Sequence, residues 1–239
     1  MASVYDGDTF TLDSGDKIRL KWVNTPELRP KEAYGEDARD FVKRLILDQT
    51  VQLVMDGPNP RDDYGRVLAG ITTPTGKDLS LAIIEDGLGH LFIIPPETND
   101  LSAHLEAQRA ARKARRGIWS TTSYLGTLHI SSFHANARGD DNTNVNGEYL
   151  RVCNVTADPV DIAGYRLMDN SGDSWTLPTL VIPPGHTVLV HSGKGSTQDD
   201  PRFQLQVYLG SDTPVWNNDF DIATLLDPKG VTVDQRPSK

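Results

Sequence analysis

The chain has 239 residues, of which 37% are hydrophobic and 24% charged, a composition typical of globular domains and not of disordered or fibrous proteins. Its apolar runs are too short for a membrane-spanning helix. Its net charge of −9 argues against a polycation that coats nucleic acid, although a local basic site is compatible with this net charge. Cys153 is the single cysteine, so no internal disulfide can form. The cysteine content therefore does not indicate whether the protein resides in an oxidising or a reducing compartment.

The first half combines short alternating runs with helical periodicity. Strands are expected over Thr9–Leu12, Lys17–Trp22, Val51–Met55 and Arg66–Ile71. Helices are expected over Lys31–Asp48, Leu79–Asp86 and Leu101–Arg116. The first helix has apolar residues at i, i+3 and i+4 spacing, and the second has Asp78 as a good N-cap and Gly87 as a good stop. We therefore expect a small strand-rich domain that carries three helices.

From Leu128 onward the pattern is nearly all strand. Strands are expected over Leu128–Ile130, Glu148–Val155, Asp161–Met168, Leu180–Ile182, Thr187–His191 and Val231–Val233. Short runs separated by turn residues favour an antiparallel β-sandwich. The predicted domains are residues 1–122 and 128–239, joined by a linker at 123–127. Residues 1–120 carry 16 Lys and Arg against 19 Asp and Glu, a net charge of −3, and residues 121–239 carry 8 against 14, a net charge of −6.

The first half contains side chains suited to phosphodiester chemistry. If Lys17–Trp22 is one strand, its apolar residues share one face and Arg19 points outward from the other. Pro26 cannot extend a strand ladder, so the chain turns there and presents Glu27 on a loop. Arg66 follows a turn glycine. Guanidinium groups match the geometry of phosphate, and a carboxylate can orient or deprotonate an attacking water.

Oxygen-bearing side chains surround these groups in the sequence. They are Asp6, Asp8, Asn24, Thr25 and Glu27. A donor set without sulfur or imidazole suits a hard cation such as Ca²⁺ and does not suit zinc. Taken singly, each short motif is more often structural than functional. Asp6 to Asp8 can simply form a turn, and Arg19 can simply pair with a surface acid.

Four motifs occur together in one order. They are Asp6-Gly7-Asp8-Thr9, Ile18-Arg19-Leu20, Asn24-Thr25-Pro26-Glu27 and Asp63-Tyr64-Gly65-Arg66. In this order and spacing they resemble the staphylococcal nuclease (thermonuclease) family, over roughly residues 4–120 and through Gly-Ile-Trp at 117–119. The resemblance implies a five-stranded OB-type barrel with three helices. It also implies a calcium-dependent nuclease that hydrolyses DNA and RNA to products ending in 3′-phosphate.

The same resemblance implies a role for individual residues. The implied catalytic residues are Arg19, Glu27 and Arg66. Both arginines would clamp the phosphate, and the glutamate would act through water as a base or orienting group. The implied calcium-binding residues are Asp6, Asp8, Asn24 and Thr25, the last through its carbonyl. The expected substrate-binding residues are Asp63 and Tyr64.

Three features depart from the family pattern. Position 24 is Asn where the best-known members carry Asp, so we expect weaker calcium affinity from this uncharged ligand. Segment 89–96 lacks the tyrosines that the type member places against the nucleotide, so base stacking falls to Tyr64 or Phe92, or is weaker. No signal peptide opens the chain and few residues precede Asp6, so either the chain was trimmed or this edge is built differently.

Four segments of the second half also occur in a known order. They are Asn146–Asn154, Pro159–Asp169, Ile182–Val190 and Trp216–Asp219. This order resembles the lamin-tail domain, an immunoglobulin-like β-sandwich, over roughly residues 125–236. Turns are expected at Gly164 and Gly185, and the expected core residues are Tyr149, Val152, Leu167 and Leu189. The resemblance implies a non-catalytic binding or targeting module.

No catalytic constellation is evident in the second half. Its four histidines lack the spacing of metal ligands on one element, and Cys153 lies in an alternating strand as a small buried side chain. The loop Asp140–Asn144 is rich in oxygen atoms, which favours a flexible loop and leaves open a second, weak cation site.

Three hypotheses for function follow. The first is a Ca²⁺-dependent phosphodiesterase acting on DNA and RNA, monomeric, and secreted or surface-borne like most of the resembling nucleases. The second is a nucleic-acid-binding scaffold of the same fold with weak or no turnover, which Asn24 favours. In the third, residues 128–239 dock to a protein or surface partner and the first domain is vestigial.

Overall fold

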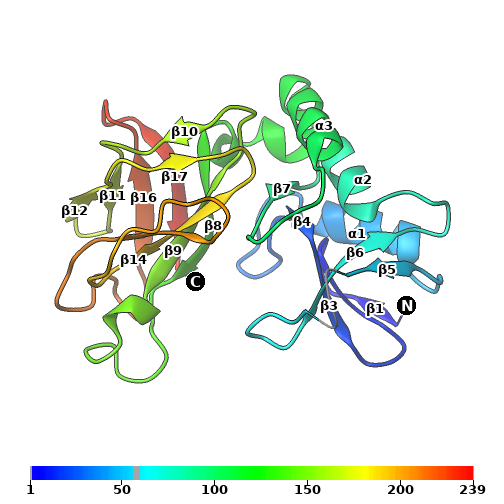
Figure 1. Cartoon of the computed structure of the whole chain (residues 1–239), viewed down its shortest axis with the longest axis horizontal. Coiled ribbons are helices and arrows are strands. Elements are labelled where there is room, and N and C mark those ends of the chain that lie inside the picture. Colours follow the sequence, from blue (N-terminus) through cyan, green and yellow to red (C-terminus); the bar gives the residue numbers. More distant parts are fainter. Residues whose placement is uncertain (1, 56–59, 239) are drawn as a thin grey trace. The chain divides into compact units, whose positions relative to one another are not determined.

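The computed structural model of the chain describes residues 2–55 and 60–238 and shows two compact units (Figure 1). The first unit comprises Met1–Ile93 and Asn99–Thr121, and the second comprises Ile94–Thr98 and Thr122–Lys239. Met1 and Lys239, the outer ends of the two predicted domains, lie outside the described residues, and the linker at 123–127 stays a prediction. Within the described ranges, no helix combines the length and apolar character that a membrane crossing needs.

The first unit is built on a mixed sheet. Its strands, in spatial order, are β1 (Ser3–Val4), β2 (Thr9–Thr11), β3 (Lys17–Leu20), β6 (Val67–Thr72) and β5 (Gln52–Val54). Strands β3 and β6 are parallel and the other neighbours are antiparallel. A separate antiparallel pair joins β4 (Trp22–Asn24) to β7 (His90–Phe92). The OB-type fold is confirmed, while the described pairing leaves β1 and β5 as ends, so closure into a barrel stays a prediction.

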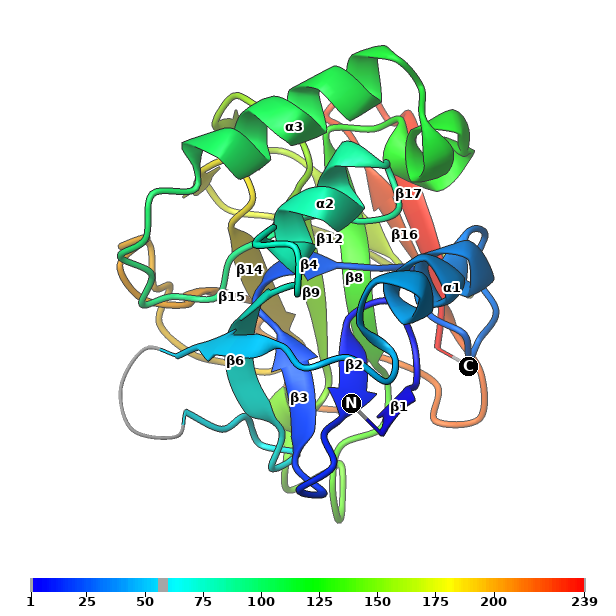
Figure 2. The same cartoon turned by 90° about the vertical axis from the view of Figure 1, so that its right-hand side faces the viewer.

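Three helices lie together beside this sheet (Figure 2). They are α1 (Gly35–Ile46), α2 (Leu79–Glu85) and α3 (Ser102–Lys113), close to the predicted positions. Helix α1 buries Ala38, Val42 and Ile46, the apolar stripe that its spacing predicts. Asp78 caps α2 by accepting from the main-chain N–H groups of Ser80 and Leu81.

The end of the first unit is tied to the end of α2. Gly87 stops α2 with a φ of +72°, and its carbonyl accepts from the N–H of Ile118 at 2.9 Å. The short 3₁₀ helix η1 (Gly117–Ser120) starts there, and Trp119 within it is fully buried. A Cβ at Gly117 would lie 2.1 Å from the Gly87 oxygen, so only glycine allows the two backbones this approach.

The predicted strand Lys17–Trp22 is wrong as one element. It breaks after Leu20, and Trp22 adopts a φ of +67°. A Cβ at Gly70 of β6 would lie 2.4 Å from the Trp22 ring, so the indole packs directly on the glycine backbone. This packing turns the chain out of the sheet to form β4, which brings Asn24 opposite His90 of β7.

The second unit is a β-sandwich. One sheet has the order β12 (Ser174–Thr176), β11 (Arg166–Met168), β16 (Ile222–Leu226) and β17 (Thr232–Pro237). The other has the order β15 (Leu205–Tyr208), β14 (Thr187–His191), β9 (Tyr149–Asn154) and β8 (Leu128–His134), with β14 and β15 parallel. A third pair joins β10 (Val160–Asp161) to β13 (Val181–Ile182), and two 3₁₀ turns are η2 (Thr122–Tyr124) and η3 (Val145–Gly147). The immunoglobulin-like class is confirmed.

Two details of the second unit differ from the sequence prediction. The expected strand Asp161–Met168 is interrupted by a turn at Gly164, whose φ is +77°, which separates β10 from β11. Val152 and Leu167 are core residues as expected. Tyr149 and Leu189 are half-buried, and it is the residues next to them in their strands, which point to the opposite face, that lie in the core. Strands β12, β15 and β16 have no counterpart among the predicted elements.

Candidate active site

The loop before β2 brings the first and third motifs together. Asp6 Oδ1 accepts from the N–H groups of Asp8 at 3.0 Å and Thr9 at 2.6 Å, which forms a tight turn. A Cβ at Gly7 would lie 2.6 Å from a Thr25 methyl carbon, so glycine is what lets the loop pass this residue. Asp8 Oδ2 in turn accepts from Thr25 N at 2.9 Å and Thr25 Oγ1 at 3.1 Å.

Arg19 is held from several sides. It lies on β3 opposite Thr9, and its side chain is only 12% exposed. Its Nη1 donates to the carbonyl of Val23 at 2.9 Å, its Nη2 donates to Asn24 Oδ1 at 2.9 Å, and its Nε lies 3.4 Å from Asp8 Oδ1. The guanidinium is therefore fixed against the end of β4 and does not extend outward as the strand pattern predicts.

Arg66 reaches the same carboxylate through an intermediate residue. Its Nη1 donates to Thr9 Oγ1 at 3.3 Å, and this hydroxyl donates to Asp8 Oδ1 at 3.2 Å. Asp62 orients the guanidinium by accepting from Arg66 Nε at 2.7 Å and from its main-chain N–H at 2.9 Å. Thr9 stands in the first motif without a predicted role, and Asp62 lies outside the motifs, although an Asp four residues before an Arg across a turn glycine signals such a pair.

The two predicted substrate-binding residues lie beside Arg66 in the turn. Tyr64 is 70% exposed, and the Arg66 guanidinium carbon lies 5.4 Å from its ring centroid. Asp63 is exposed, and its neighbour Asp62 is the residue that contacts the arginine. A second aromatic ring, that of Phe92, lies 5.7 Å from the guanidinium carbon of Arg19. Each arginine thus has one aromatic side chain against it.

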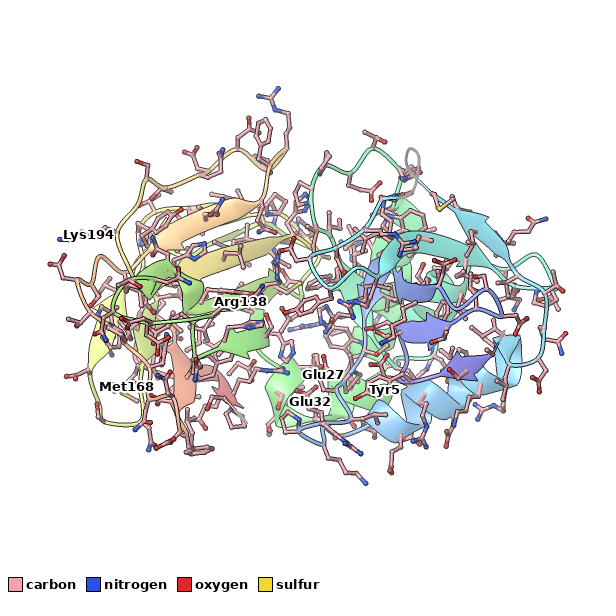
Figure 3. The ribbon with its side chains drawn as sticks, turned by 90° about the horizontal axis from the view of Figure 1, so that it is seen from below. Tyr5, Glu27, Glu32, Arg138, Met168 and Lys194 are labelled. Atoms are coloured by element: carbon pink, nitrogen blue, oxygen red, sulfur yellow. The ribbon has the colours of Figure 1, made fainter. Side chains whose placement is uncertain are left out.

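Glu27 lies on the loop that follows β4, next to Glu32 (Figure 3). Its main-chain N–H donates to Glu32 Oε2 at 2.8 Å. The charges of Asp8, Arg19 and Glu27 all act on the Asp6 carboxyl, so these four groups lie within electrostatic reach of one another. The structure therefore brings together the predicted acids and Arg19, and Thr9 connects them to Arg66.

Asp6 and Asp8 form a pair of buried carboxyl groups. Each is 6% exposed. Burial, followed by the charge of Asp8, raises the pKa of Asp6 to about 7, against the lowering effects of the Asp8 N–H and the Arg19 charge. Two adjoining buried carboxylates, an amide oxygen at Asn24 and a main-chain oxygen at Thr25 are hard donors, so the residues fit a calcium ion.

The donor set is poor in charge, however. Within residues 2–55 and 60–238, no three His, Cys, Asp or Glu side chains gather as a metal cluster. The predicted calcium ligands therefore depend on amide and main-chain oxygens in addition to two carboxylates. Asn24 Oδ1 also accepts from Arg19, so an ion at this position would compete with the guanidinium for that oxygen.

Comparison with known proteins covers both units. Residues 17–121 match the family described as staphylococcal nuclease homologue, and residues 121–238 match the Lamin Tail Domain. The Thermonuclease of Staphylococcus hyicus is 34% identical over 125 residues, which are 49% of this chain and 72% of that protein. The Thermonuclease of Staphylococcus intermedius is 32% identical over 124 residues, 48% of this chain and 72% of that protein.

Longer relatives are matched only in part. Endonuclease YhcR of Bacillus subtilis is 29% identical over 160 residues, which are 61% of this chain and 13% of that protein. The prophage-derived endonuclease YokF of the same organism is 29% identical over 128 residues and is covered over 43% of its length. The chain thus spans less than half of these two endonucleases.

Proposed function

The chain belongs to the staphylococcal nuclease homologue family through its first unit, followed by a lamin tail domain, and from this membership we propose that it is a hydrolase that cleaves phosphodiester bonds of DNA and RNA. One observation carries the proposal: Arg19 and Arg66 are both connected to the buried carboxylate of Asp8, one directly and one through Thr9. Two guanidinium groups fixed around one acidic centre suit a bridging phosphate.

We assign the roles from this arrangement. Arg19 and Arg66 bind the phosphate and stabilise the negative charge that grows on it in the transition state. The two arginines are held on β3 and immediately before β6. Binding of the phosphate therefore costs less conformational entropy than it would with mobile side chains. Glu27 orients or deprotonates the attacking water from its loop. Tyr64 and Phe92 offer faces for base stacking beside the two arginines, and Asp63 lies in the same turn as Tyr64.

Calcium is proposed as the cofactor. Asp8, Asn24 and the Thr25 carbonyl would hold it, with Asp6 adjoining, and its positive charge would offset the acidic centre and polarise the phosphate. The neutral Asn24 makes a weak site, so we expect a requirement of about 1 mM calcium, as for charge-poor oxygen sites. Products ending in 3′-phosphate are proposed from the family resemblance alone.

The second unit is proposed as a non-catalytic binding or targeting module. It contains none of the assigned site residues, and its net charge of −6 over residues 121–239 disfavours attraction of polyanions. We propose a protein or surface partner for it, and a secreted or surface-borne monomer for the whole chain. The domain boundaries remain at 1–122 and 128–239 in this proposal.

A nucleic-acid-binding scaffold is the second candidate function. It is favoured by Asn24, because this residue brings no charge to the metal position and its oxygen is taken by Arg19. In this case the arginines would bind phosphate without turnover. Oligonucleotide binding with no cleavage at any calcium concentration would support this candidate over the nuclease.

The test is digestion of single-stranded DNA and RNA oligonucleotides by the full chain, with calcium or with excess chelator. Arg66→Ala and Glu27→Gln should each lower turnover by about 10²-fold or more, because they remove a charge-stabilising and a water-orienting group. Arg61→Ala is the matched control, since this exposed arginine lies near the same turn and pairs with Asp16. Wild-type rates in both site variants would contradict the assignment, and full activity in chelator would contradict the calcium proposal.

A further inference from the structure

Three oxygen atoms in the described part of the second unit are buried without a well-formed hydrogen bond. Glu148 and Ser192 are 0% exposed and Asp141 is 8% exposed. Among the described residues, Asp141 Oδ1, Glu148 Oε1 and Ser192 Oγ make no hydrogen bond of ordinary geometry, although each atom is buried and the Ser192 hydroxyl lies close enough to Glu148 to lower its pKa. A buried carboxylate oxygen without a partner is costly, so the geometry points to a bound species that satisfies it.

The chain fold brings these residues to one end of the sandwich. Glu148 immediately precedes β9 and Ser192 immediately follows β14, the antiparallel neighbour of β9. The Ser192 N–H donates to the Glu148 carbonyl at 3.2 Å, which continues the ladder by one residue. Asp141 lies in the loop that joins β8 to β9, which leads directly into Glu148.

A single segment holds the second oxygen of each carboxylate. The N–H of Val215 donates to Glu148 Oε2 at 2.8 Å, and the Asn218 amide donates to Asp141 Oδ2. Each acid is thereby oriented through one oxygen while its other oxygen stays unpartnered. Burial raises the pKa of Glu148, the Val215 N–H, the Ser192 hydroxyl and the Trp216 N–H lower it, and the charge of Asp141 adds a smaller increase, so the two carboxylates lie within electrostatic range of each other.

The described residues supply the pair with no cationic partner. Within the described part of the chain, neither Asp141 nor Glu148 forms an ion pair with Lys, Arg or His. Lys194, two residues beyond Ser192, pairs instead with Asp212 at 2.6 Å. Two buried acids without a counter-charge are destabilising unless a cation or a proton joins them.

We propose that Asp141, Glu148 and Ser192 form a divalent-cation site in the lamin tail domain, separate from the nuclease centre, with calcium as its ion. The ligands are two carboxylates and a hydroxyl, which are hard oxygen donors and do not suit zinc. Calcium accepts irregular sets of oxygen ligands more readily than magnesium does, and so it is the ion that this set favours. The ion ties the β8–β9 loop to the start of β9, to the end of β14 and to segment 215–218.

The proposal does not depend on the nuclease function. We therefore test it by counting bound calcium, with equilibrium dialysis of the full chain at about 1 mM Ca²⁺, the range of extracellular calcium modules. Glu148→Gln and Asp141→Asn should each lower the number of ions bound per chain by one relative to the wild type. Both variants keep an acceptor for Val215 or Asn218 and touch no residue of the nuclease centre, so calcium-dependent cleavage should persist.

Asp212→Asn is the matched control, because it removes an exposed acid from the same end of the sandwich, and it should bind as many ions as the wild type. A second measurement uses the wild-type chain alone and is independent of whether a variant folds. Hydrogen exchange of peptides covering residues 135–148 and 211–218 should slow when calcium replaces chelator.

The outcomes separate the alternatives. If a buried water or a shared proton occupies the position, Glu148→Gln binds as many ions as the wild type, and the hydrogen-exchange rate of these peptides is the same with calcium as with chelator. Either result overturns the proposal. Loss of one ion in both acid variants, together with slower exchange in the wild type, supports it.

Discussion

Thr9 is the residue on which the relation between the two arginines depends. Its hydroxyl accepts from Arg66 and donates to Asp8, while Asp8 lies against Arg19. Each arginine also has an anchor of its own, Asp62 for Arg66 and the carbonyl of Val23 for Arg19. We therefore propose that the hydroxyl is a positioning group that fixes the spacing of the two charges.

Thr9→Val tests this role. Valine keeps the β-branched shape on β2 but removes both hydrogen bonds, so we expect turnover on oligonucleotides to fall about tenfold with little change in KM, as for lost positioning. Thr11→Val, two residues along the same strand, is the matched control. Steady-state kinetics of both variants provide the comparison, and equal rates in the two would exclude a positioning role for Thr9.

Asn24→Asp tests the metal position. The added charge should lower the calcium concentration needed for half-maximal cleavage by about tenfold, because carboxylate ligands bind calcium more tightly than amides. It also gives Arg19 a charged partner in place of the amide oxygen. A calcium titration of activity measures the change, and an unchanged midpoint would mean that position 24 is not a ligand.

The sequence could predict the charged residues of the site but not all of their contacts. Arg19, Glu27 and Arg66 stand in motifs whose order carries information even when each motif is weak. The fourth motif includes Asp63 and not Asp62. The sequence does not show which of two adjacent acids turns back toward an arginine, because this depends on the loop conformation.

At the scale of secondary structure, α2 depends on a charged cap. Asp78 caps the helix and lies 3.3 Å from Nε2 of His104 on α3. Burial opposes the charge, but the hydrogen bonds from His104 and Ser80 outweigh it and lower the pKa of Asp78 below its ordinary value. The ionised carboxylate thus stabilises the fold at neutral pH, and this stability is lost as the pH falls through the folded-state pKa.

Asp78→Asn should flatten this acid dependence. Asparagine still caps the helix, so we expect a loss of about 1 kcal/mol at pH 7 from the charge alone and less loss on going from pH 5 to pH 2 than in the wild type. Guanidinium unfolding at several pH values measures it. Asp86→Asn, at the opposite end of α2, is the control, and parallel pH profiles for wild type and Asp78→Asn would contradict the assignment.

Elements with a strong local period could be predicted, and elements set by tertiary contacts could not. The stripe of α1 and the cap of α2 are visible in the sequence because helix geometry repeats every few residues. The break at Trp22 has no local signal, since neither glycine nor proline marks it; packing of the indole on Gly70 imposes it. Strand β15 pairs in parallel with β14. A parallel pair is not joined by a tight hairpin turn, so the turn residues of the sequence do not predict it.

At the scale of the whole molecule, the assigned catalytic groups and the proposed second cation site belong to different units. Residues 1–123 should therefore cleave short oligonucleotides at the rate of the full chain. Residues 124–239 should neither cleave nor bind free nucleic acid at physiological salt, where charges are screened beyond about 8 Å and the net charge of residues 121–239 is −6. Cleavage and salt-dependent binding assays of both fragments provide the measurement, and tight oligonucleotide binding by the second fragment would make it a substrate-capture domain.

The contact between Gly87 and Ile118 also bears on how the chain is made. A ribosome releases the chain from the N-terminus, and the residues that tie off the end of α2 and bury Trp119 are among the last of the first unit to emerge. Until they do, the first unit lacks the segment that closes its helical side. We therefore expect the first unit to complete its fold only after translation of the second unit has begun.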